Sequence, residues 1–112
     1  MKVLAGLRTK DQARAPAVWW FEVRNALMMS GRRGRSGEVD TTEFLRGLAR
    51  LSIGIDRAPN ETTLLTLARR HRLTVYDAAY LELAHRDGLP LASLDGALRK
   101  AARASGVTLL GD

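Results

Sequence analysis

The sequence predicts an α/β fold in which a mostly parallel central sheet is flanked by helices. Runs with helical spacing of apolar residues alternate with short apolar runs that suit strands, and this alternation is typical of βα units. The 112 residues have the length of one domain, and the hydrophobic share of 46% is ordinary for a globular protein. We see no internal repeat or linker.

Two helices and a strand dominate the expected amino-terminal half. Gly31 is placed to end the first complete helix, and Ser36 is placed to cap the next helix. The residues that follow this second helix alternate between apolar and polar as in a strand. In order, the expected elements are the end of a helix at 2–10, a short strand or its exit at 15–18, a helix at 19–30, a helix at 38–50 and a strand at 51–55.

The carboxyl-terminal half is expected to be regular α/β alternation. Leu64 and Leu67 share one face of a helix that Pro59 precedes, Gly88 stops the following helix, and Gly106 releases the chain into a last strand. The expected elements are a helix at 60–71, a helix at 75–87, a strand at 89–93, a helix at 96–105 and a strand at 107–110.

The charge favours nucleic acid as a partner. The net charge is +6, and fifteen of the eighteen basic residues are arginine, whose planar fork suits phosphate. We expect Arg32, Arg33 and Arg35 to guide RNA, although cations near a helix end also favour the helix dipole. The chain lacks cysteine and any apolar run near the ~20 residues of a membrane helix, so we expect a cytoplasmic protein with no membrane contact.

Three carboxylates lie where surface charge is not expected. Glu22 projects between the apolar positions Ala26 and Met29, Asp77 opens a helix, and Asp95 follows a strand. If the start of the Asp77 helix and the end of the strand before Asp95 lie side by side, these two carboxylates converge outside the carboxyl ends of the strands, where open parallel sheets bind ligands. An oxygen-only cluster suits Mg²⁺ or Mn²⁺.

Each carboxylate also has a purely structural interpretation. Asp77 completes a capping box with Thr74, and Asp95 is placed to cap the helix that begins at Gly96. Glu22 is able to pair with an arginine of another helix. Both interpretations stay open at this point.

Over residues 13–111 the chain resembles the VapC-type PIN-domain ribonucleases, the toxins of bacterial toxin–antitoxin pairs. The segments that carry the resemblance are PAVWWFEVRNALMMSGRRGR, LARRHRLTVYDAAYLELAHRDGLPLASLD and LRKAARASGVTLLG. The resemblance implies that Glu22, Asp77 and Asp95 bind Mg²⁺ or Mn²⁺, and that Asn25 and Ser93 orient these acids.

The function implied by the resemblance is hydrolysis of RNA by a metal-activated water. It further implies a cognate antitoxin and a homodimer as protein partners. The alternative is a catalytically inactive binding module that pairs with an antitoxin or with itself. Apolar residues on the first complete helix are candidates for that interaction, unless they are ordinary core residues: Trp19, Trp20, Met28 and Met29.

One feature of the family has no counterpart in residues 1–11. VapC-type domains begin with a central strand that carries an Asp, and Asp11 lies in a loop context. We therefore expect residues 1–112 to form a single PIN-like domain, amino-terminally truncated relative to the family, with an incomplete metal site and a sheet without its usual first strand. A longer natural protein is the other explanation.

Overall fold

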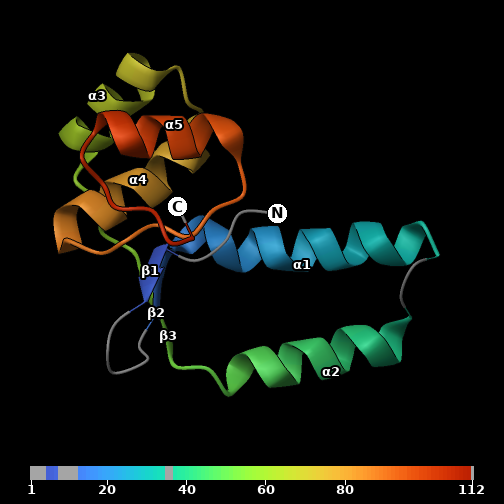
Figure 1. Cartoon of the computed structure of the whole chain (residues 1–112). Coiled ribbons are helices and arrows are strands. Elements are labelled where there is room, and N and C mark those ends of the chain that lie inside the picture. The colour runs from blue at the N-terminus through green and yellow to red at the C-terminus, as the bar shows by residue number, and fades with distance from the viewer. Residues whose placement is uncertain (1–4, 8–12, 35–36, 112) are drawn as a thin grey trace.

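In the part of the chain that the structure describes, five helices flank a small sheet that contains a parallel pair of strands, which confirms the predicted α/β class. The computed structural model describes residues 5–7, 13–34 and 37–111. Helices α3, α4 and α5 pack on one side of the short strands, and α1 and α2 project to the other side (Figure 1). The elements are β1 (Ala5–Leu7), β2 (Ala13–Pro16), α1 (Ala17–Arg32), α2 (Glu38–Ala49), β3 (Ile53–Asp56), α3 (Glu61–His71), α4 (Val75–Asp87) and α5 (Gly96–Ala104).

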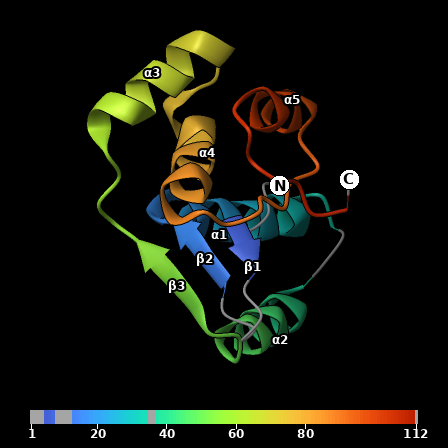
Figure 2. The ribbon, with the colours of Figure 1, turned by 60° about the vertical axis from the view of Figure 1, so that its left-hand side comes forward.

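The sheet has the order β1-β2-β3, with one parallel and one antiparallel pairing. Strands β2 and β3 run parallel, with Pro16 opposite Asp56 at their carboxyl ends, whereas β1 is antiparallel to β2 (Figure 2). The strands predicted at 89–93 and 107–110 reduce to one parallel bridge between Leu91 and Leu109. Among the described residues, no strand pairing joins this bridge to the three-stranded sheet.

The prediction of a helix end at 2–10 is wrong for the part that the structure describes. Ala5–Leu7 is a strand, because pairing with β2 satisfies backbone groups that so short a helical segment would leave unbonded. The expected strand at 15–18 straddles a boundary, since β2 ends at Pro16 and α1 begins at Ala17.

The first long helix runs past its predicted stop. Gly31 lies inside α1, and the Arg33 amide donates to the Met29 carbonyl at 3.1 Å. The left-handed turn falls at Gly34 instead, where φ is 71°. At the start of α2, Gly37 occupies the N-cap position, and Ser36, the predicted cap, lies outside the described residues.

The later helix boundaries agree with the predictions within a residue or two. The Asn60 side chain accepts from the Thr63 amide at 2.9 Å and caps α3. Helix α4 ends just before Gly88, whose φ of 64° is left-handed. Helix α5 ends at Ala104, one residue earlier than expected.

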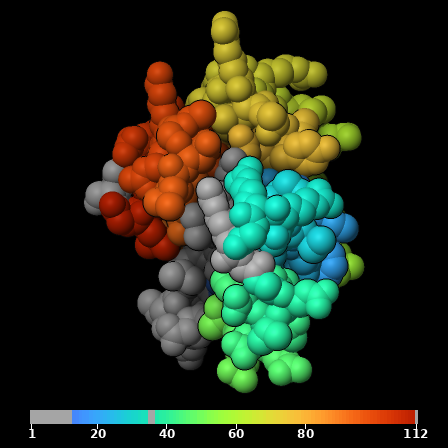
Figure 3. Space-filling view, turned by 90° about the vertical axis from the view of Figure 1, so that its right-hand side faces the viewer, coloured from blue at the N-terminus to red at the C-terminus, as the bar shows by residue number. Residues whose placement is uncertain are grey.

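The core is centred on α4. Tyr80, Leu81 and Leu83 are fully buried, and they pack with buried residues of α1, α3 and α5, namely Trp19, Val23, Leu67, Leu98, Ala101 and Ala102. By contrast, α2 has no buried residue. We call the two projecting helices, α1 and α2, the α1–α2 arm; Figure 3 looks onto its outer end. No helix in the described residues has both the length and the apolar character needed to cross a bilayer.

Candidate metal centre and the ion-pair network

Glu22 of α1 is joined to α4 by a hydrogen bond. The Tyr80 hydroxyl donates to Glu22 Oε1, and the Tyr80 side chain is fully buried while Glu22 is partly exposed. Burial raises the pKa of Tyr80, and the hydrogen bond to Glu22 and the charges of Glu22 and Asp77 raise it further. Tyr80 therefore stays protonated and remains a donor. The charges of Glu22 and Asp77 thus both raise the pKa of this one hydroxyl.

Asp77 lies in the first turn of α4. Its backbone amide donates to Thr74 Oγ1 at 3.1 Å, so Thr74 is the N-cap of this helix. This bond is the Thr74 half of the capping box expected from the sequence. A carboxylate in the first turn is also favoured by the positive end of the helix dipole.

Asp95 caps α5. Its Oδ2 accepts from the Leu98 amide at 2.9 Å, which confirms the structural interpretation of this residue. The buried Ser93 hydroxyl accepts from the Asp95 amide at 3.1 Å, and Arg99 donates to the Ser93 carbonyl at 2.9 Å. Ser93 thereby fixes the turn that presents Asp95.

The Tyr80 hydroxyl is hydrogen-bonded to Glu22, and the charge of Asp77 helps to raise its pKa, whereas Oδ2 of Asp95 is bonded to the start of α5. Across residues 5–7, 13–34 and 37–111, no group of three or more acidic or histidine side chains is arranged to hold a metal ion. The donor chemistry still fits, because Mg²⁺ is often bound through only one or two carboxylates together with substrate phosphates. The metal role of all three residues stays a prediction.

Three of the remaining predicted residues, Asn25, Arg32 and Arg33, are described by the structure, and all three are exposed. Asn25 is exposed on α1, so its orienting role stays a prediction. Arg32 ends α1 and Arg33 follows it, and both side chains are exposed. Arg35 lies outside the described residues.

An ion-pair network that the sequence analysis missed connects β2, β3 and α4. Arg86 donates to Asp56 Oδ2 at 2.6 Å and to Glu82 Oε2 at 2.7 Å. Arg14 donates to Asp87 Oδ2 at 2.5 Å and to Asp56 Oδ1 at 3.3 Å. The signal available in the sequence was Glu82, an acid inside an apolar run with an arginine one turn later.

Burial makes this network important for stability. The side chains of Asp56 and Glu82 are 7% and 1% exposed, and a buried carboxylate is costly unless it is paired and hydrogen-bonded. Glu82 Oε2 also accepts from the Asn60 amide at 3.2 Å, which ties the start of α3 to α4. The network is therefore a structural clamp that joins α3 and α4 to the strands.

Exposed apolar side chains stand next to the predicted carboxylates. Phe21, Tyr76 and Leu94 directly precede Glu22, Asp77 and Asp95 in the chain, and they are 67%, 63% and 86% exposed. The sequence analysis did not single out these three residues.

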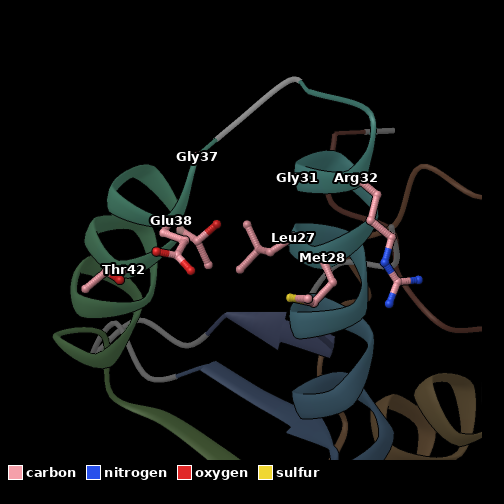
Figure 4. A pocket seen from close by; sticks show the side chains of 8 residues that line it. Leu27, Met28, Gly31, Arg32, Gly37, Glu38 and Thr42 are labelled. Carbon is pink, nitrogen blue, oxygen red and sulfur yellow. The ribbon is translucent and has the colours of Figure 1, made fainter.

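A pocket of about 560 Å³ separates the two helices of the α1–α2 arm. Figure 4 shows Leu27 of α1 directed toward Glu38 and α2, whereas Arg32 points away from α2. Elsewhere on α1, Trp20 and Met28 are about half exposed, but Trp19 is buried in the core. The proposed interface role of Trp19 is therefore wrong, because its side chain packs in the core and is not available to a partner.

The chain belongs to the PIN-domain family, whose family model matches residues 2–104. PIN domains are in general nucleases, and they generally use divalent metal ions and typically bind RNA. The chain is also similar to a solved structure, that of PAE2754 from Pyrobaculum aerophilum, with 27% identity and a TM-score of 0.68. That similarity covers 79% of this chain and 60% of PAE2754, so this chain spans less than two thirds of that protein. No curated protein matches the chain.

Proposed function

We propose that this chain is a metal-dependent endoribonuclease of the VapC toxin type, formed as one PIN-like domain over residues 1–112 and acting in the cytoplasm. The observation that carries the proposal is the hydrogen bond from the buried Tyr80 hydroxyl of α4 to Glu22 of α1, and the charge of Asp77, in the first turn of α4, also raises the pKa of Tyr80. Acidic side chains on a basic molecule suit a divalent cation and an RNA phosphate.

In this proposal Glu22, Asp77 and Asp95 hold Mg²⁺ or Mn²⁺. When bound, such an ion supplies an acidified water and stabilises charge on the phosphate. The Tyr80 hydroxyl fixes the Glu22 carboxylate, Thr74 fixes the first turn that carries Asp77, and Ser93 orients the Asp95 backbone. The chain's own residues thus act by positioning, and Asn25 supports them from α1.

The first test is cleavage of a mixed RNA substrate in the presence of Mn²⁺ or Mg²⁺. We expect Asp77→Asn to lower the cleavage rate at least about 100-fold, because a misplaced reacting group can cost that much. A chelator is expected to abolish cleavage. Asp40→Asn is the matched control, since Asp40 also lies in the first turn of a helix but is exposed on the arm. Equal rates for the two variants would contradict the assignment.

A second candidate function is a binding module without catalysis, whose partner is a cognate antitoxin or a second copy of the chain. The observation that favours it is the exposed apolar surface of the arm, where Phe21, Met28 and Val39 are 67%, 55% and 70% exposed. Light scattering, which measures the molar mass in solution, would test the homodimer. We expect the double variant Met28→Gln, Val39→Gln to shift the equilibrium from dimer toward monomer. A monomeric wild-type chain without nuclease activity would leave the antitoxin as the partner to seek.

A further inference from the structure

A small apolar pocket lies where β2 and β3 end and α4 begins. Its volume is about 190 Å³, and Pro16, Val18, Pro59 and Tyr76 contribute to its wall together with Arg57. The parallel strands β2 and β3 both finish at this edge, which is where open α/β sheets bind ligands. The pocket is separate from the larger one inside the α1–α2 arm.

The lining of this pocket includes close chain neighbours of both Glu22 and Asp77. Tyr76 immediately precedes Asp77 in the first turn of α4. Val18 lies one helical turn before Glu22, so the two residues share a face of α1. A group seated in the pocket would therefore lie next to the proposed site of cleavage.

The chemistry of the wall fits one planar, uncharged ring attached to a phosphate. The Tyr76 ring is 63% exposed, and the rest of the wall is apolar apart from the exposed Arg57 and the buried Asp56, whose charge is paired with Arg86 and Arg14. Pockets for drug-sized ligands typically measure about 300–1,000 Å³, so a volume near 190 Å³ suits a smaller group. Exposed aromatic side chains stack on unpaired bases, and arginine binds phosphate.

We infer that this pocket receives a single unpaired base of an RNA strand, stacked on Tyr76, with Arg57 close to the adjoining phosphate. The inference rests on the proposed ribonuclease function and adds to it a binding pocket for one base of the substrate. An apolar peptide side chain would also suit the walls, but Arg57 and the net charge of +6 favour the polyanion.

The test measures binding without cleavage. A short single-stranded RNA containing 2-aminopurine is titrated with the protein in EDTA, and stacking is followed by quenching of the 2-aminopurine fluorescence. We expect Tyr76→Ala to weaken binding roughly 5- to 140-fold, the range for loss of one base–aromatic stack, and to abolish the quenching. Tyr76→Phe keeps the ring and should bind as the wild type does. Arg57→Gln should weaken binding and lower its salt dependence.

Phe44→Ala is the matched control, because Phe44 is an exposed aromatic residue of α2 that does not line this pocket. It is expected to leave the affinity unchanged. Circular dichroism would verify that Tyr76→Ala remains folded. The inference would be overturned if Tyr76→Ala bound RNA as tightly as the wild type, or if Phe44→Ala lost as much affinity as Tyr76→Ala. It would also be overturned if Tyr76→Ala weakened the binding of duplex RNA as much as that of single-stranded RNA.

Cleavage assays on the same proteins separate this inference from the proposed function. If the wild type binds RNA through Tyr76 but never cleaves it with Mn²⁺, the pocket assignment stands and the ribonuclease proposal fails. If the wild type cleaves RNA while Tyr76→Ala binds and cleaves equally well, the ribonuclease proposal stands and the pocket assignment fails.

Discussion

At the scale of single residues, the Tyr80 hydroxyl is the group on which the candidate site depends. It is buried, it donates to Glu22, and the charge of Asp77 helps to raise its pKa. We expect Tyr80→Phe to lower the free energy of unfolding by about 1.5–3 kcal/mol, the usual contribution of a hydrogen bond to a charged group. Urea denaturation at pH 7 measures this loss. Tyr76→Phe removes the hydroxyl from an exposed ring and should leave the free energy of unfolding almost unchanged.

The same hydroxyl predicts a dependence of stability on alkaline pH. The pKa of Tyr80 is raised in the folded chain, mainly by burial, whereas an unfolded tyrosine ionises near pH 10. The stabilisation is therefore complete below about pH 10 and is lost at higher pH, where only the unfolded chain releases the proton. The stability advantage of the wild type over Tyr80→Phe should shrink in urea denaturation above about pH 10. A constant difference up to about pH 11 would contradict the raised pKa.

The sequence predicted local interactions at the site better than distant ones. The cap formed by Asp95 and the pairing of Thr74 with Asp77 each join residues of a single helix start, so helix-start patterns reveal them. The bond from Tyr80 to Glu22 joins residues 58 positions apart, and no local pattern specifies it. No local pattern specifies whether Asp95 joins Glu22 and Asp77 around a metal either, so that role stays a prediction.

At the scale of elements, Arg86 holds α4 to the end of β3. Replacing it with methionine would leave Asp56 and Glu82 buried with one partner fewer. We expect Arg86→Met to lower the free energy of unfolding by about 3–5 kcal/mol, the usual cost of breaking a buried ion pair. Urea denaturation tests this against Arg70→Met, an exposed arginine of α3 whose replacement should change the stability by no more than about 0.5 kcal/mol.

Arg86→Lys tests whether the geometry matters as well as the charge. A guanidinium bonds two carboxylates at once through its planar fork, and an ammonium group is a point charge. The stability of the lysine variant should therefore lie between those of the wild type and Arg86→Met. A lysine variant as stable as the wild type would show that charge alone is sufficient.

Helices were predicted more reliably than strands, because helices carry their own boundary signals. The Asn60 side chain caps the start of α3, and the left-handed backbone of Gly88 ends α4. Strands depend on partners that are distant in the sequence, so the prediction for 2–10 was wrong and 89–93 proved to be a single bridge at Leu91. The alternation of elements was nevertheless sufficient to predict the α/β class.

At the scale of the whole molecule, the net charge of +6 predicts strongly salt-dependent binding of RNA. Replacing Arg32, Arg33 and Arg35 with glutamine should reduce the slope of log affinity against log salt by about 0.7 for each phosphate that the protein no longer neutralises. The same change at Arg69, Arg70 and Arg72 removes equal charge from the carboxyl-terminal end of α3. An unchanged slope for the first variant, or equal effects of both, would count against a guiding role for the arm.

The sparse packing of the α1–α2 arm has a consequence for motion. No residue of α2 is buried, whereas α4 contributes most of the largest fully buried side chains. Segments with little buried apolar surface open locally at much lower free energy than the core. In native-state hydrogen–deuterium exchange, the α2 amides should therefore exchange first and those around Tyr80 last. Part of the arm is then able to open locally while Tyr80 continues to hold Glu22 in place.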